Sequence, residues 1–222
     1  MNLKSIKFGG TSMGSAESIQ ECAKIVKEKI NKSLVVVTVS AVGGITDKLI
    51  EIIKLARKTK PRLVKSKVIE ISNIHKQILK NLTSNDEEAE NLWVQEFEPI
   101  INKLEAISYG TSLVGDLTDK TEARICAFGE KLSSLLMLLA LEKIGIASQR
   151  IESERIIKTD NNYLKAKVNF QATSLSSKKI LRPIFLKKIV PVVTGFIGKD
   201  THGNITLLGR GRKCNYFARY GK

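Results

Sequence analysis

The chain has few cysteines, few prolines, few aromatic residues and no long hydrophobic run. Its three cysteines, Cys22, Cys126 and Cys214, form no Cys-x-x-Cys pair, which excludes a disulfide framework and a zinc site of the usual spacing. The longest apolar stretches, around 34–39 and 135–141, are far shorter than the roughly 20 residues that a membrane span needs. The amino terminus also lacks an apolar signal-peptide core. These absences predict a cytoplasmic protein with reduced thiols, no membrane contact and no metal-ligating cluster.

Negative charge is scarce relative to positive charge. Lys and Arg number 37 against 22 Asp and Glu, which gives a formal net charge of +15. A basic chain raises the hypothesis of phosphodiester binding through counterion release. The lysines, however, are spread over every segment with helical periodicity, and no aromatic residues alternate with them. We therefore expect solvated helix faces and no specific nucleic-acid partner.

The chain is long enough, with 222 residues of which 42% are hydrophobic, to bury the core of one large domain. Residues 3–8 and 34–39 are predicted strands, and each runs into small residues that precede a predicted helix. The first of these helices is expected from Ser15, as its N-cap, to about residue 32, and the second is expected to begin near Thr46 or Asp47. Two strand-glycine-helix units in succession predict an α/β sandwich with a mainly parallel sheet.

Helical periodicity dominates the middle of the chain. Apolar residues recur at helical spacing from about 62 to 107 and are interrupted at 83–86, which predicts an inserted helical hairpin. Further expected elements are a helix over 121–144, short strands at 146–151 and 156–157, a helix over 175–188, a buried strand over 190–198, and a hairpin turn at Gly203-Asn204.

Glycine and hydroxyl residues follow several of the predicted strands. The clearest case is Lys7-Phe8-Gly9-Gly10-Thr11-Ser12, where glycines let the backbone approach an anion and the lysine adds a charge. Similar turns occur at 40–44, 195–198 and 208–211. Because ligands of open α/β sheets bind beyond the carboxyl ends of the strands, we expect these four loops to converge on one site.

Each candidate side chain also has a structural interpretation. Lys7, at the end of a strand expected to be buried, would need an anion or carboxylate partner, unless its stem reaches the surface. Ser40 and Thr46 bind a ligand carboxylate or cap a helix. Glu130 receives a ligand ammonium or lies on the surface. Arg210 contacts a carboxylate or is a solvated loop residue.

Six ordered segments resemble the amino acid kinase family and, within it, the aspartokinases. They are Lys7 to Ser12, Val39 to Asp47, Phe128 to Ser133, Ile157 to Asp160, Thr194 to Gly198, and Leu208 to Gly211. The resemblance implies a three-layer sandwich of the carbamate kinase-like type. It also implies ATP- and Mg²⁺-dependent phosphorylation of the side-chain carboxylate of L-aspartate to 4-phospho-L-aspartate, the first step toward lysine, threonine and methionine.

The resemblance also implies residue roles. Lys7 would neutralise the transferring phosphoryl group, and the ATP phosphates would be surrounded by Gly9, Gly10, Thr11 and Ser12. L-aspartate would be held by Ser40, Thr46, Glu130 and Arg210, with Glu130 at its α-ammonium and Arg210 at a carboxylate. No general base is needed, because the acceptor carboxylate is already ionised at neutral pH.

The agreement with the family stops after Gly211. Residues 1–211 are expected to form the N-terminal part of an amino acid kinase domain, truncated within it, and 212–222 a basic tail that does not match. A second departure is Glu152-Ser153-Glu154-Arg155, where the family usually has Asp-x-Arg. The alternative hypothesis is a non-catalytic remnant that binds aspartate, or that pairs with a complementary fragment or with a second copy of itself as a homo-oligomer.

Overall fold

The structure, a computed structural model, describes residues 2–209 and centres on a four-stranded parallel sheet. The strand order is β1-β2-β4-β3, so β1 and β3 are the edge strands. Their bounds are β1 Leu3–Phe8, β2 Leu34–Val39, β3 Ser148–Ile151 and β4 Val190–Thr194. β1 and β2 coincide with the strands predicted from the sequence. The predicted α/β fold with a parallel sheet is confirmed.

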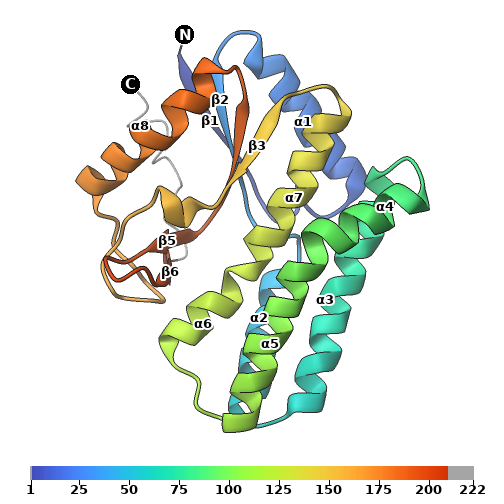
Figure 1. Cartoon of the computed structure of the whole chain (residues 1–222), viewed down its shortest axis with the longest axis vertical. Coiled ribbons are helices and arrows are strands. Elements are labelled where there is room, and N and C mark those ends of the chain that lie inside the picture. The colour runs from blue at the N-terminus through green and yellow to red at the C-terminus, as the bar shows by residue number, and fades with distance from the viewer. Residues whose placement is uncertain (1, 210–222) are drawn as a thin grey trace.

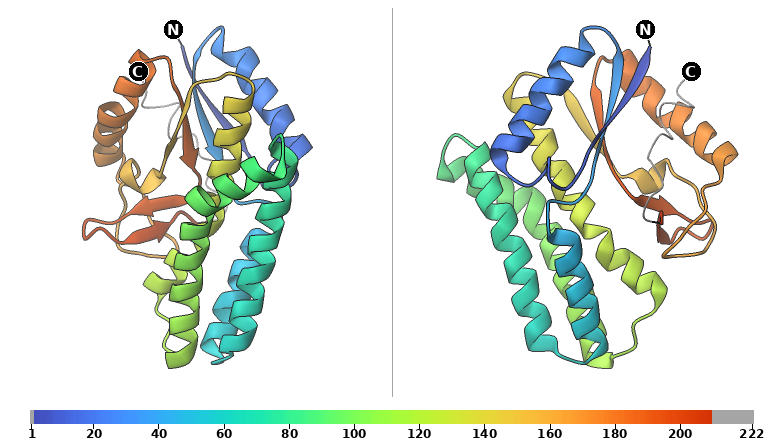
Figure 2. Two further views of the ribbon diagram at one scale, coloured as in Figure 1. Left: turned by 45° about the vertical axis from the view of Figure 1, so that its right-hand side comes forward. Right: turned by 180° about the vertical axis from the view of Figure 1, so that it is seen from behind.

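Helices cover both faces of this sheet (Figures 1 and 2). Helices α1 (Ala16–Ile30) and α7 (Phe128–Lys143) lie on one face, and α8 (Phe170–Leu186) lies on the other. The alternation of side chains in β2 follows from this arrangement, because successive residues of a strand point to opposite faces. Val35, Val37 and Val39 belong to the larger hydrophobic core, on the α1 and α7 side, and Val36 belongs to the smaller core under α8.

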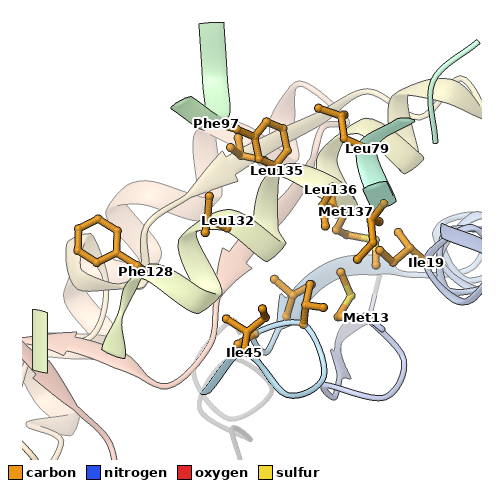
Figure 3. Close-up of a cluster of buried hydrophobic side chains, with 14 of the residues drawn as sticks. Met13, Ile19, Ile45, Leu79, Phe97, Phe128, Leu132, Leu135, Leu136 and Met137 are labelled. Carbon is orange, nitrogen blue, oxygen red and sulfur yellow. The ribbon is translucent and has the colours of Figure 1, made fainter. Parts of the chain in front are cut away.

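The larger core continues into a helical extension below the sheet (Figure 2). It consists of α2 (Ile45–Arg57), α3 (Pro61–Leu82), α4 (Asp86–Leu92), a π-helical turn η1 (Trp93–Phe97), α5 (Glu98–Val114) and α6 (Asp119–Cys126). Figure 3 shows Leu132, Leu136 and Met137 of α7 packed between this extension and the sheet layer. Because all three are fully buried, α7 joins the two parts of the molecule.

The predicted strand over 190–198 is divided between two sheets. β4 ends at Thr194, and β5 (Ile197–Lys199) pairs antiparallel with β6 (Ile205–Leu207) in a separate hairpin. At the division, Gly195 packs against β2 and Phe196 adopts a left-handed backbone with φ of 63°. A bend of this kind leaves no periodic signal, since all residues on either side remain buried.

Three further predictions needed correction. The helix over 121–144 is interrupted at Ala127, which separates α6 from α7. The strand at 156–157 is wrong: a 3₁₀ turn, η2 (Ser153–Arg155), precedes it, and only isolated bridges at Lys158 and Thr159 follow. α8 begins at Phe170 rather than 175, because the side chain of Asn169 accepts a hydrogen bond from the N–H of Ala172 and caps the helix earlier.

None of the helices formed by residues 2–209 combines the length and the apolar character needed to cross a membrane. The basic tail predicted at 212–222 lies outside the described residues.

Gly195 should be intolerant of any side chain. A Cβ at this position would lie 2.7 Å from the carbonyl oxygen of Val39, and strand backbone cannot move aside easily. We expect Gly195→Ala to lower the free energy of unfolding by about 1–3 kcal/mol, as for overpacked cores, measured by urea denaturation. The control is Gly110→Ala in α5, where a Cβ meets nothing within 4 Å, and where alanine should stabilise the helix by about 1 kcal/mol. Equal stability of the two variants would contradict the steric argument.

Candidate active site

A cavity of about 290 Å³ opens at the carboxyl ends of β1 and β2. Four of the residues singled out from the sequence line it: Lys7, Ser40, Thr46 and Glu130. They come from four separate places in the fold, namely the end of β1, the loop after β2, the first turn of α2 and the first turn of α7. The remaining lining residues are Ile50, Glu122, Cys126, Leu164, Phe196 and Leu207.

Lys7 is exposed rather than buried. The expectation that Lys7 lies at the end of a buried strand was wrong, because β1 is an edge strand and pairs with β2 alone among the described residues. Its ammonium forms no ion pair with any carboxylate in residues 2–209. Within the part of the chain that the structure describes, Lys7 therefore presents an unpaired, solvated cation to the cavity, which suits an anionic ligand.

In contrast to Lys7, Glu130 is buried, with an exposed fraction of only 6%. Burial raises its pKa from 4.5 to about 8, although the backbone N–H groups of Glu130 and Ala41 and the charge of Lys7 act against this shift. With a pKa of about 8, roughly nine-tenths of the Glu130 side chains carry a proton at pH 7 in the empty protein. A cation placed beside Glu130 would favour the ionised form of its carboxyl group.

The first turn of α7 is fixed against the loop that carries Ser40. The hydroxyl of Ser133 donates a 2.6 Å hydrogen bond to the carbonyl oxygen of Ser40. Gly129 approaches so closely that a Cβ there would lie 2.7 Å from the Cβ of Ala41. These two contacts hold Glu130 in a constant position relative to Ser40, a form of preorganisation that reduces the entropy lost on ligand binding.

The hydroxyls of Ser40 and Thr46 do not cap α2. The N-cap position belongs to Gly44, whose φ is 79° and which makes no side-chain capping bond. Within the described part of the chain neither hydroxyl takes part in a hydrogen bond. Both are left available to a ligand in the cavity.

The glycine turn after β1 does not line the cavity but lies next to the second glycine turn. Gly10 packs against Ala41 and Gly43, with a Cβ position 3.3 Å from the carbonyl oxygen of Ala41. Across residues 2–209, the N–H groups of Gly10, Thr11 and Ser12 donate no hydrogen bond. Consecutive free N–H donors beside a lysine are the features that phosphate groups require, and a side chain at Gly9 would meet nothing within 4 Å.

Some lining residues were not singled out from the sequence. Glu122 and Cys126 come from α6, and Glu122 is paired with Arg57 at 2.7 Å. Phe196 lies inside the segment Thr194 to Gly198, and only its left-handed backbone distinguishes it. Arg210 lies outside the described residues. No group of three or more His, Cys, Asp or Glu side chains in the described chain is arranged to hold a metal ion.

The fold and the cavity together define an α/β protein with a small-ligand site where the loops after parallel strands meet. The sequence model of the amino acid kinase family matches residues 4–213, and the chain belongs to that family.

Aspartokinases are among the relatives that the comparisons found. The chain is 30% identical to the aspartokinase of Chlamydia trachomatis over 205 residues, which are 92% of this chain and 42% of the relative. It superimposes with a TM-score of 0.81 and 27% identity on Escherichia coli aspartokinase III in complex with lysine and aspartate, and with a TM-score of 0.80 on the same enzyme with aspartate and ADP. Each match covers 95% of this chain and 44% of the solved chain. The chain thus spans less than half the length of these relatives.

The raised pKa of Glu130 should make stability depend on pH. Between pH 4.5 and about 8 the folded chain holds a proton on Glu130 that the unfolded chain has released, so the free energy of unfolding falls as pH rises through this window. Glu130→Gln keeps the shape and stays neutral. We expect this variant to gain stability on the order of several kcal/mol over the unaltered chain at pH 9 and little at pH 4.5, measured by urea denaturation.

The matched control is Glu90→Gln, which changes an exposed glutamate of α4. Its difference from the unaltered chain should stay constant between the same two pH values. A Glu130→Gln difference that is equally constant would show that Glu130 titrates normally.

Proposed function

We propose that the cavity binds L-aspartate and that the chain catalyses transfer of the γ-phosphoryl group of ATP to the side-chain carboxylate. One observation carries the proposal: Lys7, Ser40, Thr46 and Glu130, which come from three separate stretches of the sequence, line one cavity. Family membership and the aspartate and ADP bound to the similar E. coli enzyme support it.

Aspartate would be oriented by its two charged ends. Its α-ammonium would lie against Glu130, which loses its proton and gains a charge-assisted hydrogen bond. The hydroxyls of Ser40 and Thr46 would donate hydrogen bonds to carboxylate oxygens, and Arg210 is proposed to contact a carboxylate as well. The side-chain carboxylate would then point toward Lys7 at the mouth of the cavity.

The transfer itself needs alignment and charge neutralisation rather than a base. An oxygen of the aspartate side chain forms a bond to the γ-phosphorus of ATP while the bond from that phosphorus to the β–γ bridging oxygen breaks, which yields 4-phospho-L-aspartate and ADP. Lys7 would stabilise the negative charge on the phosphoryl oxygens, and the free N–H groups of 10–12 would hold the phosphates. Mg²⁺, which usually arrives with the phosphates and keeps several waters, would add neutralising charge.

A second candidate function is aspartate binding without turnover. The aspartate side of the cavity is buried and preformed around Glu130, whereas the parts assigned to ATP in the described residues are only Lys7 and the turn 9–12. Pairing with a complementary fragment, or with a second copy of the chain as a homo-oligomer, belongs to the same candidate.

Aspartate-dependent phosphorylation should depend on Lys7. Aspartyl phosphate would be trapped with hydroxylamine after incubation of the 222-residue chain with ATP, Mg²⁺ and L-aspartate. Loss of a transition-state charge contact lowers turnover by about a hundredfold or more, so we expect at least this loss in Lys7→Ala. The control is Lys4→Ala, an exposed lysine of the same strand that does not line the cavity. No product from a folded chain that binds aspartate would leave the second candidate.

Aspartate binding should release a proton and strengthen with pH. Since the pKa of Glu130 is about 8 in the empty protein, ionisation must accompany ammonium binding below this pH. We expect the affinity to rise by about tenfold per pH unit from pH 6 to 8 and then to level off. Calorimetry in two buffers of different ionisation enthalpy should detect close to one released proton at pH 7.

Glu130→Gln should weaken binding by about 1.5–3 kcal/mol, the range for a hydrogen bond to a charged group, and should abolish the proton release. Tight, pH-independent binding by this variant would rule out Glu130 as the ammonium partner.

A further inference from the structure

The cavity has two walls that belong to different parts of the fold. One wall is helical and includes Thr46 of α2, Cys126 of α6 and Glu130 of α7. The other wall consists of Leu164, Phe196 and Leu207, from the segment around the β5–β6 hairpin. A ligand that touches both walls requires a constant separation between them.

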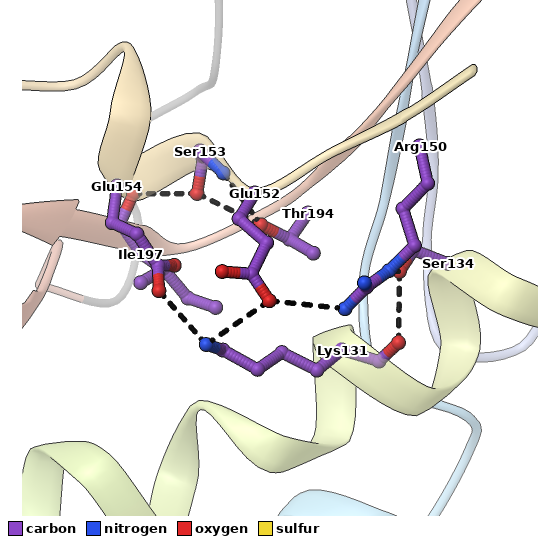
Figure 4. Close-up of polar contacts among 8 residues, drawn as sticks. All are labelled: Lys131, Ser134, Arg150, Glu152, Ser153, Glu154, Thr194 and Ile197. Atoms are coloured by element: carbon purple, nitrogen blue, oxygen red, sulfur yellow. Dashed lines mark hydrogen bonds and ion pairs between the residues drawn. The ribbon is translucent and has the colours of Figure 1, made fainter. Parts of the chain in front are cut away.

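Lys131, the residue after Glu130, links the helical wall to the segment that follows β3. Its ammonium lies 2.8 Å from Oε1 of Glu154 and 3.3 Å from Oε1 of Glu152 (Figure 4). The Lys131 side chain is 15% exposed and that of Glu154 is 6% exposed. The pair is therefore largely shielded from water, and screening by salt is weak there.

Arg150 of β3 belongs to the same cluster of charged side chains, because it contacts both Ser134 of α7 and Glu152. It donates a 2.8 Å hydrogen bond from Nε to the hydroxyl of Ser134 and a 3.2 Å bond to Oε1 of Glu152. The hydroxyl of Ser134 in turn donates to the carbonyl oxygen of Lys131 at 2.8 Å. Although burial opposes the shift, Lys131 and Arg150 hold the pKa of Glu152 below its usual value. We call Lys131, Arg150, Glu152 and Glu154 the clamp.

The clamp continues to the second wall through Ser153, which lies between its two glutamates. The N–H of Ser153 donates to Oγ1 of Thr194 at 2.9 Å, and its hydroxyl donates to the carbonyl oxygen of Ile197 at 2.8 Å. Figure 4 shows Thr194 and Ile197 beside Ser153. In the sequence these two residues stand on either side of the bend at Phe196. Lys131, the neighbour of Glu130, is thus connected through its two glutamates and Ser153 to the side chain of Thr194 and the backbone of Ile197, on either side of Phe196.

Net stability is a poor explanation for this arrangement. A buried ion pair contributes little compared with apolar side chains of the same size. In addition, Oε2 of Glu154 is buried without a hydrogen-bond partner among the described residues, which is unfavourable. The ion pairs and hydrogen bonds of the clamp instead provide a defined geometry, which an apolar contact would not provide.

We propose that Lys131 is a positioning residue of the cavity: through the clamp it sets the separation between the wall that carries Glu130 and the wall that carries Phe196. The proposal concerns the aspartate site and so rests on the proposed function. Its further content is that a residue outside the cavity controls how tightly the small acidic ligand is enclosed and how dry Glu130 remains.

The test compares Lys131→Met, which keeps the apolar stem and removes the charge, with two controls. Lys131→Arg keeps the charge, and Lys143→Met removes a different ion pair, with Glu88, from the other end of the same helix. Two quantities are measured on the full chain: the dissociation constant for L-aspartate by calorimetry, and the titration of the Glu130 carboxyl carbon by ¹³C NMR.

We expect Lys131→Met to weaken aspartate binding by about tenfold, a factor equal to about 1.4 kcal/mol, while both controls stay within about twofold. A looser cavity admits water, so the Glu130 titration midpoint should fall below that of the unaltered chain. The direction is informative, because loss of the Lys131 charge alone would move the midpoint upward. An unchanged or raised midpoint, or unchanged binding, would overturn the proposal.

The two proposals fail differently. If the unaltered chain does not bind aspartate, the proposed function fails, but a lowered Glu130 midpoint in Lys131→Met still supports the clamp and an unchanged midpoint still overturns it. If Lys131→Met does not fold, Arg150→Met is used in its place, since it also removes a positive charge from the clamp. A lowered Glu130 midpoint in Arg150→Met would support the proposal, and an unchanged or raised midpoint would overturn it.

Discussion

The burial of the Glu130 carboxyl group is the constraint on which the rest of the site depends. A carboxyl group that is 6% exposed is unfavourable in its ionised form unless a cation accompanies it. The surrounding contacts maintain this condition: Gly129 lets α7 approach Ala41, and Ser133 bonds to the loop at Ser40. The chain therefore keeps a neutral acid in place, at some expense in stability above pH 5, and a cation beside this carboxyl group would favour its ionised form.

The parallel sheet explains why such distant residues meet. Strands that run in one direction deliver all their carboxyl-end loops to one edge, so β1, β2 and β4 bring their small-residue turns together. Because β1 is an edge strand, the two charged groups of the site differ in their exposure to water. Both Lys7 and Glu130 line the cavity, but Lys7 is exposed to water and Glu130 is buried. In the proposed function, L-aspartate would place its ammonium against the buried Glu130 and its acceptor oxygen near the solvated Lys7.

Much of the sheet could be predicted from the sequence, because a continuous β-branched run such as Leu34–Val39 has one structural outcome. The N-cap of α1 at Ser15 was also predicted from the sequence, and the structure confirms it. The errors occurred where tertiary contacts override periodicity. The division of 190–198 depends on how closely Gly195 approaches Val39, and the interruption at Ala127 separates two helices whose apolar pattern is continuous. Neither the close approach of Gly195 nor the helix break at Ala127 changes the local spacing of apolar residues, so neither could be predicted from periodicity.

The candidate site also has a part that could be predicted from the sequence and a part that could not. Ordered motifs indicated Lys7, Ser40, Thr46 and Glu130, since each stands beside glycines at a strand or helix end. The clamp was visible only as a departure, Glu152-Ser153-Glu154, because the sequence does not say which cation faces each carboxylate. In the fold Lys131 lies between both glutamates, and Arg150 satisfies the first of them. Two carboxylates and two cations balance, so the departure from Asp-x-Arg is compensated within the chain, and the wall that carries Phe196 remains attached to the helix that carries Glu130.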